Sequence, residues 1–243
     1  MRASIFSILV LGVAMAMTAG AGFESDILQA ANGDLRITFI GHGSLLFESG
    51  GRTLYVDPDG RLADFAAMPR ADLILVSHQH GDHFDPKAIA ALRHDATEIF
   101  VSASCLPRPA GSGVLNNGDR RESSGIVIEA VPAYNLVHKR PDGRPFHPAG
   151  EGNGYVLTFP GLRVYVAGDT ENIPEMKELK NIDVAFLPMN VPYTMTPEMT
   201  ALAAKVLRPR ILYPYHFSDT DPQRLVNLLR DEPAIEVRVR KMN

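Results

Sequence analysis

The sequence predicts a single α/β domain, and three features of the chain support this prediction. Short runs rich in β-branched and aromatic residues, separated by glycine-rich turns, fill the stretch from Leu35 to Val56. Such a pattern is typical of an antiparallel meander that opens a sheet. From Leu73 onward, strand-like runs alternate with helical patterns, as they do in β-α-β units. No repeat, low-complexity tract or long linker divides the chain, and its length suits one domain with a full core.

The first 21 residues are expected to be a signal peptide and not part of the fold. Arg2 supplies a positive charge, an apolar run of signal-peptide length follows it, and Ala19-Gly20-Ala21 fits a cleavage site of small residues. The apolar run is too short and too rich in small residues for a membrane span, and a retained anchor is the alternative. We therefore expect a periplasmic or secreted domain over residues 22–243, without stable membrane insertion after cleavage.

Charge and cysteine content narrow the classes of partner. Without the leader about 222 residues remain, with 23 basic against 28 acidic side chains. No Lys/Arg cluster typical of nucleic-acid binding is present, and no basic amphipathic helix typical of membrane docking. Cys105 is the only cysteine, which excludes an intramolecular disulfide and fits a small buried residue. The expected partner is a small-molecule substrate, and the sequence leaves open whether the chain forms a homo-oligomer.

The first strands are expected before residue 57, and two polar residues in their connections have open interpretations. The strand-like runs are Leu35–Ile40, Ser44–Glu48 and Thr53–Val56. His42 stands between two glycines, and Asp57 ends the third run. Either residue can support a metal-binding histidine by hydrogen bonding. Either can equally be an ordinary turn residue.

A dense group of metal-binding residue types follows the buried strand predicted over Leu73–Val76. The group consists of His78, His80, Asp82 and His83. Imidazole nitrogens and carboxylate oxygens are the ligands that Zn²⁺, Mn²⁺ or Fe²⁺ prefer. We expect Gly81 to allow a sharp backbone turn, so that the residues before and after it face one point. A loop of merely solvated histidines explains this density poorly, and the sequence therefore predicts a metal site.

Helices and strands alternate over the rest of the chain. Four helices are predicted, three of them from an Asp or Thr followed by proline, which is typical of a helix N-cap and first residue. They are Asp85–Arg93, Ile173–Leu179, a helix starting at Thr196-Pro197-Glu198 and one starting at Asp221-Pro222. The predicted strands are Glu98–Ser102, Ile126–Val131, Tyr155–Phe159, Arg163–Ala167, Val184–Leu187, Ile211–Tyr213 and Ile235–Val239.

The pattern His-x-His-x-Asp-His after a core strand resembles the signature of the metallo-β-lactamase superfamily. The likeness continues at Gly168-Asp169-Thr170 and at Tyr213-Pro214-Tyr215-His216, each after a strand-like run, so it spans about residues 35–220. Gly41-His42-Gly43-Ser44 and Val56-Asp57-Pro58 are similar to the branch of ascorbate-phosphate-lactonase-like small hydrolases. The resemblance implies a four-layer αββα sandwich, with two sheets face to face and helices outside.

The resemblance also implies a binuclear metal site, with Zn²⁺ expected and Mn²⁺ or Fe²⁺ as alternatives. One metal would be held by His78, His80 and His147 and the other by Asp82, His83 and His216, with Asp169 between them. His147 is the uncertain member. The family's remaining histidine follows a strand ending like Ala130–Ala133, where this chain has Tyr134-Asn135. His147 is the preferred substitute, and His138 and Asn135 are the alternatives.

The function that the resemblance implies is that of an exported metal-dependent hydrolase acting on an ester, lactone or phosphodiester bond. The metals would activate a water molecule, and Asp82 would be the catalytic residue that also steers protons. No Gly-x-Ser-x-Gly motif supports a serine nucleophile. The alternatives are a β-lactamase and a metal-binding protein without turnover. Near His147, the cations Lys139, Arg140 and Arg144 form either an anion-binding rim or a solvated surface.

Overall fold

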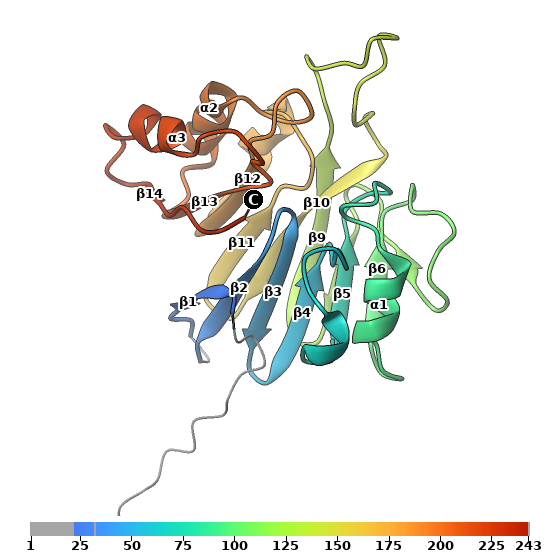
Figure 1. The fold of residues 1–243 in the computed structure, drawn as a ribbon. Helices are drawn as coiled ribbons and strands as arrows, with labels where there is room; N and C mark the ends of the chain where they lie inside the picture. Colours follow the sequence, from blue (N-terminus) through green and yellow to red (C-terminus); the bar gives the residue numbers. More distant parts are fainter. Residues whose placement is uncertain (1–21, 32, 243) are drawn as a thin grey trace, which may run out of the picture.

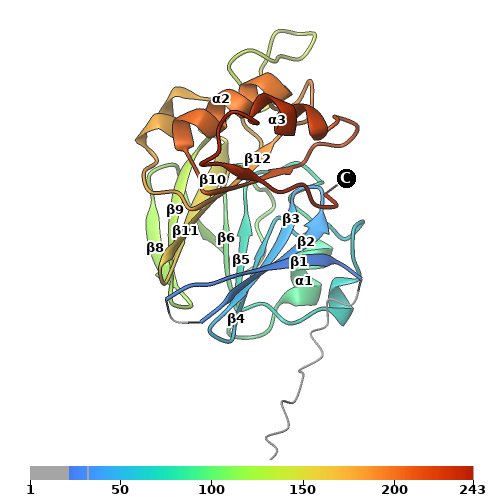
Figure 2. The same cartoon turned by 90° about the vertical axis from the view of Figure 1, so that its left-hand side faces the viewer.

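The computed structural model describes residues 22–31 and 33–242, so the predicted signal peptide lies outside the described residues. Over these two ranges, two seven-stranded sheets pack face to face, and the helices cover their outer faces (Figure 1, Figure 2). The α/β sandwich expected from the sequence is therefore confirmed. None of the helices in the described ranges is long and apolar enough to cross a membrane.

The first half of the chain forms one sheet, in which the strands follow each other in sequence order. They are β1 (Glu24–Leu28), β2 (Leu35–Gly41), β3 (Ser44–Ser49), β4 (Arg52–Val56), β5 (Leu73–Val76), β6 (Glu98–Val101) and β7 (Gly113–Val114). Pairing is antiparallel from β1 to β4 and parallel from β4 to β7. The 3-10 helix η1 (Phe65–Ala67) and the helix α1 (Pro86–Leu92) pack on the outer face (Figure 1). There Ile89 and Leu92 join an apolar cluster with Ile74.

The second half repeats the same order of pairing in the other sheet. Its strands are β8 (Arg120–Ser123), β9 (Ile126–Ala133), β10 (Gly152–Phe159), β11 (Leu162–Val166), β12 (Val184–Pro188), β13 (Ile211–Tyr215) and β14 (Glu236–Val237). Pairing is antiparallel from β8 to β11 and parallel from β11 to β14. The outer face carries the 3-10 helix η2 (Pro174–Glu178) and the helices α2 (Pro197–Leu207) and α3 (Gln223–Leu228) (Figure 2).

Aromatic side chains fill the space between the two sheets. The Phe39 ring of β2 lies 5.0 Å from the Tyr213 ring of β13, and Phe47 of β3 lies 6.0 Å from Phe186 of β12. All four are almost completely buried. Since one buried aromatic side chain removes about 150–250 Å² from water, these contacts hold the sheets in a fixed relation. The loops at the carboxyl ends of both sets of parallel strands consequently share one edge.

The elements that sequence reasoning missed or misjudged lack an apolar pattern. β1 and β8 are mostly exposed, because the segments Glu24–Leu28 and Arg120–Ser123 are largely polar. The helix expected over Ile173–Leu179 is a 3-10 helix, and no side chain caps its start. The final strand is limited to Glu236–Val237. The caps at Asp85 and Thr196 are present as predicted, since both side chains accept hydrogen bonds from the first turn of their helices.

Candidate metal centre

The chain brings five of its eight histidines together near the carboxyl ends of the parallel strands of both sheets. His78, His80, Asp82 and His83 lie on the connection from β5 to α1. The other half contributes His147 from the β9–β10 connection, Asp169 after β11 and His216 after β13. The loops that follow parallel strands are the usual place for ligands in such sheets.

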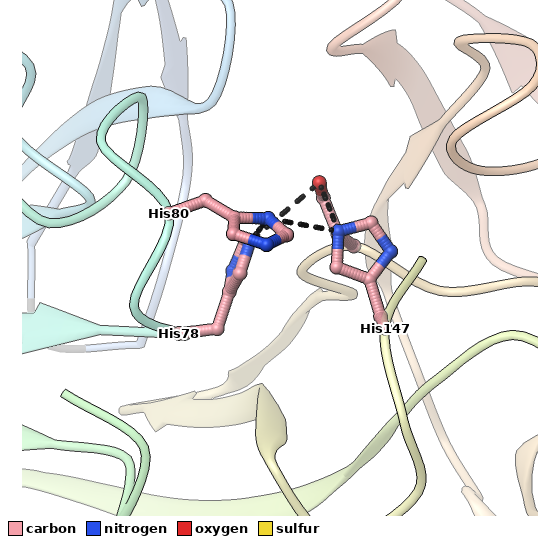
Figure 3. Close-up of side chains that lie close together, drawn as sticks. His78, His80 and His147 are labelled. Carbon is pink, nitrogen blue, oxygen red and sulfur yellow. Dashed lines mark hydrogen bonds and ion pairs between the residues drawn. The ribbon is translucent and has the colours of Figure 1, made fainter. Parts of the chain in front are cut away.

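Three histidines and one oxygen of Asp169 form a first cluster. The Nε2 atom of His78 lies 3.0 Å from Nδ1 of His80, and Nε2 of His147 lies 3.2 Å from the same atom. Figure 3 shows the three rings converging from the two loops. The Oδ2 atom of Asp169 lies 3.1 Å from Nε2 of His147. All four atoms lie within 4.8 Å of one another, so one cation can contact them together.

The other oxygen of Asp169 faces a second cluster. Its Oδ1 atom lies 3.4 Å from Nε2 of His83 and 3.4 Å from Nε2 of His216. The Oδ2 atom of Asp82 lies 3.5 Å from the same nitrogen of His216 and 3.7 Å from that of His83. Asp169 thus stands between two groups of ligand atoms and offers one oxygen to each.

Unpartnered atoms in the second cluster provide a test of whether a metal fits. Within the described residues, the buried Nε2 atoms of His83 and His216 and Oδ1 of Asp169 have no hydrogen-bond partner. Leaving a buried polar atom unsatisfied costs about 1–3 kcal/mol, and these three atoms point at one another. A cation would satisfy all of them at once, and nitrogen and carboxylate donors suit Zn²⁺, Mn²⁺ or Fe²⁺. The residues therefore fit a metal ion.

The electrostatics favour the metal-binding protonation states of Asp169, His78 and His80. Burial raises the pKa of the Asp169 carboxyl, but the charges of His216 and His83 outweigh burial and hold that pKa well below its usual range. Burial, followed by the charge of His83, holds the pKa of His78 well below that of a free histidine. Burial and His147 lower the pKa of His80 in the same way. A carboxylate beside neutral imidazoles is the form that binds a cation.

Asp57 orients His83 from below the metal loop. This carboxylate is completely buried; it accepts a 2.8 Å hydrogen bond from Nδ1 of His83 and two more from the backbone and hydroxyl of Ser77. Burial lowers the pKa of His83, but Asp169 and Asp57 outweigh burial and raise that pKa well above its usual value. A bound cation would displace the proton from Nε2, while the proton on Nδ1 stays with Asp57. Asp57 was expected either to support a metal-binding histidine or to be an ordinary turn residue, and this geometry agrees with the first. His42 also lies at the site, with its Nε2 3.2 Å from Oδ2 of Asp82.

Asn135 orients His147 in a similar manner. The Oδ1 atom of Asn135 lies 2.8 Å from both Nδ1 and the backbone N of His147. Its Nδ2 donates to the buried carboxylate of Glu171, which also accepts bonds from three backbone N–H groups of residues 136–138. His138 lies at this carboxylate, with Nδ1 2.8 Å from Oε1 of Glu171. Of the three candidates, His147 is therefore the one whose ring reaches the cluster.

Two glycines near the site have different importance. A Cβ atom on Gly43 would lie 2.9 Å from Cε1 of His83, so this position must remain without a side chain for His83 to occupy its place. The backbone turns at Gly81 as expected, since the N–H groups of His83 and Phe84 both donate to the carbonyl of His80. The turn does not require glycine, because Gly81 has no positive φ and a Cβ there would meet nothing within 4 Å.

A pocket opens over the two clusters. Its volume is about 190 Å³, below the roughly 300–1,000 Å³ typical of drug-sized ligands. It is lined by His80, Asp82, Arg140, Phe146, His147, Asp169, Asn190, Tyr193 and His216. Asn190 and Tyr193 come from the loop between β12 and α2, over residues 189–195, which the sequence also indicates as part of the wall of the site, whereas no pattern marks Phe146. A larger depression of about 730 Å³ is lined by residues between 60 and 91, and none of them belongs to the clusters.

Comparison with known proteins agrees with this geometry. The model of the beta-lactamase superfamily domain matches residues 36–216. The chain belongs to this superfamily. A relative from Geobacillus thermodenitrificans, a UPF0173 metal-dependent hydrolase, is 32% identical over 213 residues, covering 80% of this chain and 93% of that protein. One of the same name from Nitratidesulfovibrio vulgaris is 36% identical over 201 residues, covering 75% of this chain and 80% of its own. The chain is thus a member of the metal-dependent hydrolases of this superfamily.

A solved structure also supports membership among these metal-dependent hydrolases. The crystal structure of a protein from Parabacteroides distasonis, assigned as a metal-dependent hydrolase, superposes with a TM-score of 0.86 at 48% identity. The superposition covers 91% of this chain and all of that one. The metallo hydrolase Igni18 from Ignicoccus hospitalis has the same fold, with a TM-score of 0.68 at 24% identity.

Proposed function

We propose that this member of the family hydrolyses an ester, lactone or phosphodiester bond with two metal ions, one in each cluster. The observation that carries the proposal is the placement of Asp169, whose two oxygens face separate groups of histidines. One cluster would use His78, His80 and His147 and the other Asp82, His83 and His216. Zn²⁺ is the metal we expect, with Mn²⁺ or Fe²⁺ as alternatives.

The chain's own residues have distinct tasks in this reaction. Bound metal ions would make a water molecule nucleophilic near neutral pH and polarise the bond under attack. Asp169 would hold the clusters together, and Asp57 and Asn135 would fix the orientations of His83 and His147. Asp82 is the more exposed carboxylate, since 31% of its side chain is exposed against 4% for Asp169. Burial raises the pKa of Asp82, but the hydrogen bonds from His216 and His42 outweigh burial and hold that pKa well below its usual range. Asp82 would therefore face the pocket as a carboxylate, which suits a metal ligand, and in this proposal it would also steer protons.

Metal content and turnover of the protein lacking residues 1–21 test this proposal. We expect about two metal ions per chain and cleavage of at least one substrate among bis(p-nitrophenyl) phosphate, a lactone and a β-lactam. His147→Ala should lose metal and turnover, whereas the control His138→Ala should keep both, because its ring lies at Glu171. A protein that binds no metal under any reconstitution would refute the hydrolase proposal. Full metal content without turnover would favour a binding protein, and cleavage confined to the β-lactam would favour a β-lactamase.

We also propose that the protein is exported, as the leader-like pattern of the first 21 residues suggests. Cell fractionation of the full chain and of a chain without these residues tests this directly. Export predicts that the full chain reaches the periplasm or medium in a shortened form and that the truncated chain stays in the cytoplasm. Recovery of both proteins in the cytoplasm at full length would refute it.

A further inference from the structure

One positive side chain of the pocket forms no ion pair with any carboxylate of residues 22–31 and 33–242. Arg140 lines the pocket together with His80 and His147. It lies on the β9–β10 connection, which projects beyond the strands (Figure 1, Figure 2). No carboxylate of the described residues forms an ion pair with it, although one is close in sequence. Asp142, two residues away, is bound by Arg144, with an Nη2–Oδ2 distance of 2.7 Å.

Local contacts hold the Arg140 guanidinium toward the pocket. Its central carbon lies 5.2 Å from the centre of the Phe146 ring, and Nη2 donates a 3.3 Å hydrogen bond to the carbonyl of Phe146. The Phe146 ring packs edge-on against Tyr193, another residue of the pocket wall. The backbone N–H of Arg140 donates to the carbonyl of Arg144, and the carbonyl of Arg140 accepts from the N–H of Gly143. These two bonds close the tip of the loop into a tight turn. A stacked guanidinium loses less freedom when it binds a planar anion.

The other cations of the loop do not share this position. Lys139 and Arg144 are absent from the pocket lining, and Arg144 is occupied by Asp142. The two interpretations of this loop therefore apply to different residues: Arg140 borders the pocket, whereas Arg144, which is exposed as well, does not line it and pairs with Asp142. Of the five N–H groups of a guanidinium, one bonds to the protein at Phe146, which leaves donors for a ligand.

We propose that Arg140 is a specificity-determining residue, which binds a carboxylate or phosphate group that the substrate carries beside the bond to be cleaved. The inference rests on the proposed function, because it assumes that cleavage occurs at the adjacent clusters. An arginine presents paired donors that match the oxygens of either anion. The small pocket places such a group close to the reacting bond, so neutral substrates of equal size should be poorer ones.

The experiment compares metal-loaded full-length wild type with Arg140→Gln, Arg140→Lys and Arg144→Gln. Arg144→Gln is the matched control, since it removes the same charge from the same loop outside the pocket. Calorimetry measures binding of succinate and of inorganic phosphate, and a preference for one distinguishes a carboxylate from a phosphate subsite. Kinetics compare p-nitrophenyl hemisuccinate, which carries a free carboxylate, with neutral p-nitrophenyl butyrate.

We expect Arg140→Gln to weaken binding of the preferred anion and to raise the KM for the anionic ester about 10- to 100-fold, as for the loss of one charged hydrogen bond. The KM for the neutral ester and the metal content should not change, Arg140→Lys should recover part of the affinity, and Arg144→Gln should resemble wild type. Equal loss in Arg144→Gln, or no loss in Arg140→Gln, would overturn the proposal. If the wild type cleaves neither these esters nor the phosphodiester, lactone and β-lactam named above, but anion binding still depends on Arg140, the proposed hydrolysis fails while the anion site stands.

Discussion

The two halves of the molecule have the same strand pairing but supply the metal centre in different ways. In each half the pairing is antiparallel up to the fourth strand and parallel from that strand to the seventh. The fourth strand is β4 in the first half and β11 in the second. The first half places four ligand candidates on one connection, His78 to His83. The second half spreads His147, Asp169 and His216 over three connections. The same strand topology can therefore supply metal ligands from one short stretch of sequence or from distant stretches that meet only in the folded chain.

The supporting residues differ in a related way. In each half a buried carboxylate follows the strand at which the pairing becomes parallel, Asp57 after β4 and Glu171 after β11. Asp57 contacts its histidine directly, with 2.8 Å to His83. Glu171 acts through the amide of Asn135, which contacts His147. His147 therefore has a neutral amide, that of Asn135, at its Nδ1 atom, and the charged carboxylate of Glu171 lies one residue further away.

The largest effect is expected where the two halves' ligands meet, at Asp169. Asp169→Ala removes an oxygen from both clusters, so we expect metal content to fall in both and turnover to fall by about a thousand-fold or more. Elemental analysis and initial rates measure this. Asp183→Ala, whose carboxylate accepts a bond from the Arg163 backbone away from the clusters, is the control. Retention of two metals in Asp169→Ala would show that the clusters do not depend on a shared carboxylate.

Removing the two supporting acceptors should affect mainly one cluster each. Asp57→Ala deprives His83 of its partner and Asn135→Ala deprives His147, and we expect each to weaken its own metal site about 10- to 100-fold. A smaller effect of Asp57→Ala on the first cluster would pass through the Ser77 hydroxyl, which contacts both Asp57 and Nδ1 of His78. Chelator competition followed by metal analysis separates the two losses, since each variant should keep one tight site. If both variants lost the same metal, the assignment of one histidine to each cluster would be wrong.

A steric test compares two glycines of the same region. Gly43→Ala forces a Cβ to 2.9 Å from the His83 ring, and overpacking of this kind costs about 1–3 kcal/mol. We expect weaker metal binding at the second cluster with little change in the first. Gly81→Ala, which lies inside the metal motif but faces open space, should behave like wild type. A loss in Gly81→Ala of the same size as in Gly43→Ala would contradict this account.

The smallest effect is expected on stability alone, at a contact between the halves that involves no residue of the clusters. Asp26 of β1 accepts hydrogen bonds from Tyr213, Arg238 and Arg240 of the second half. Burial raises the pKa of Asp26, but the bonds from Tyr213 and Arg240 outweigh it and lower that pKa. A lowered folded-state pKa stabilises the fold above the unfolded value of about 3.9, and this contribution disappears as pH falls through the folded value.

Asp26→Asn should therefore lower the free energy of unfolding of the metal-free protein by about 1–3 kcal/mol at pH 7. The difference from wild type should shrink as the pH approaches 3, which thermal unfolding across this range measures. Asp142→Asn, which changes an exposed pair in the β9–β10 loop, should leave stability unchanged at every pH. A constant difference between Asp26→Asn and wild type would exclude a role for ionised Asp26.

The sequence allowed most of the fold and the contiguous half of the site to be predicted, because both depend on local patterns. Apolar runs ending in ligand residue types identify β5 and the motif after it. The position of His147 depends instead on how a long loop folds against Asn135 and Glu171, and residue spacing does not reveal that. For the same reason Arg140 and Arg144 look equivalent in the sequence, although only Arg140 borders the pocket. Strands β1 and β8 escaped prediction because their side chains are mostly polar.

The composition of the two clusters also affects the stability of the whole protein. Every cluster combines atoms from the first and second halves of the chain, so a bound ion would act as a cross-link between the two sheets. Its binding free energy would then add to the resistance of the whole sandwich to unfolding, by about 2.7 kcal/mol per site when free metal is a hundred-fold above the dissociation constant. Resistance of this protein to proteases would then depend on the concentration of free metal. Loss of metal would abolish activity and also expose the unfolded chain to degradation.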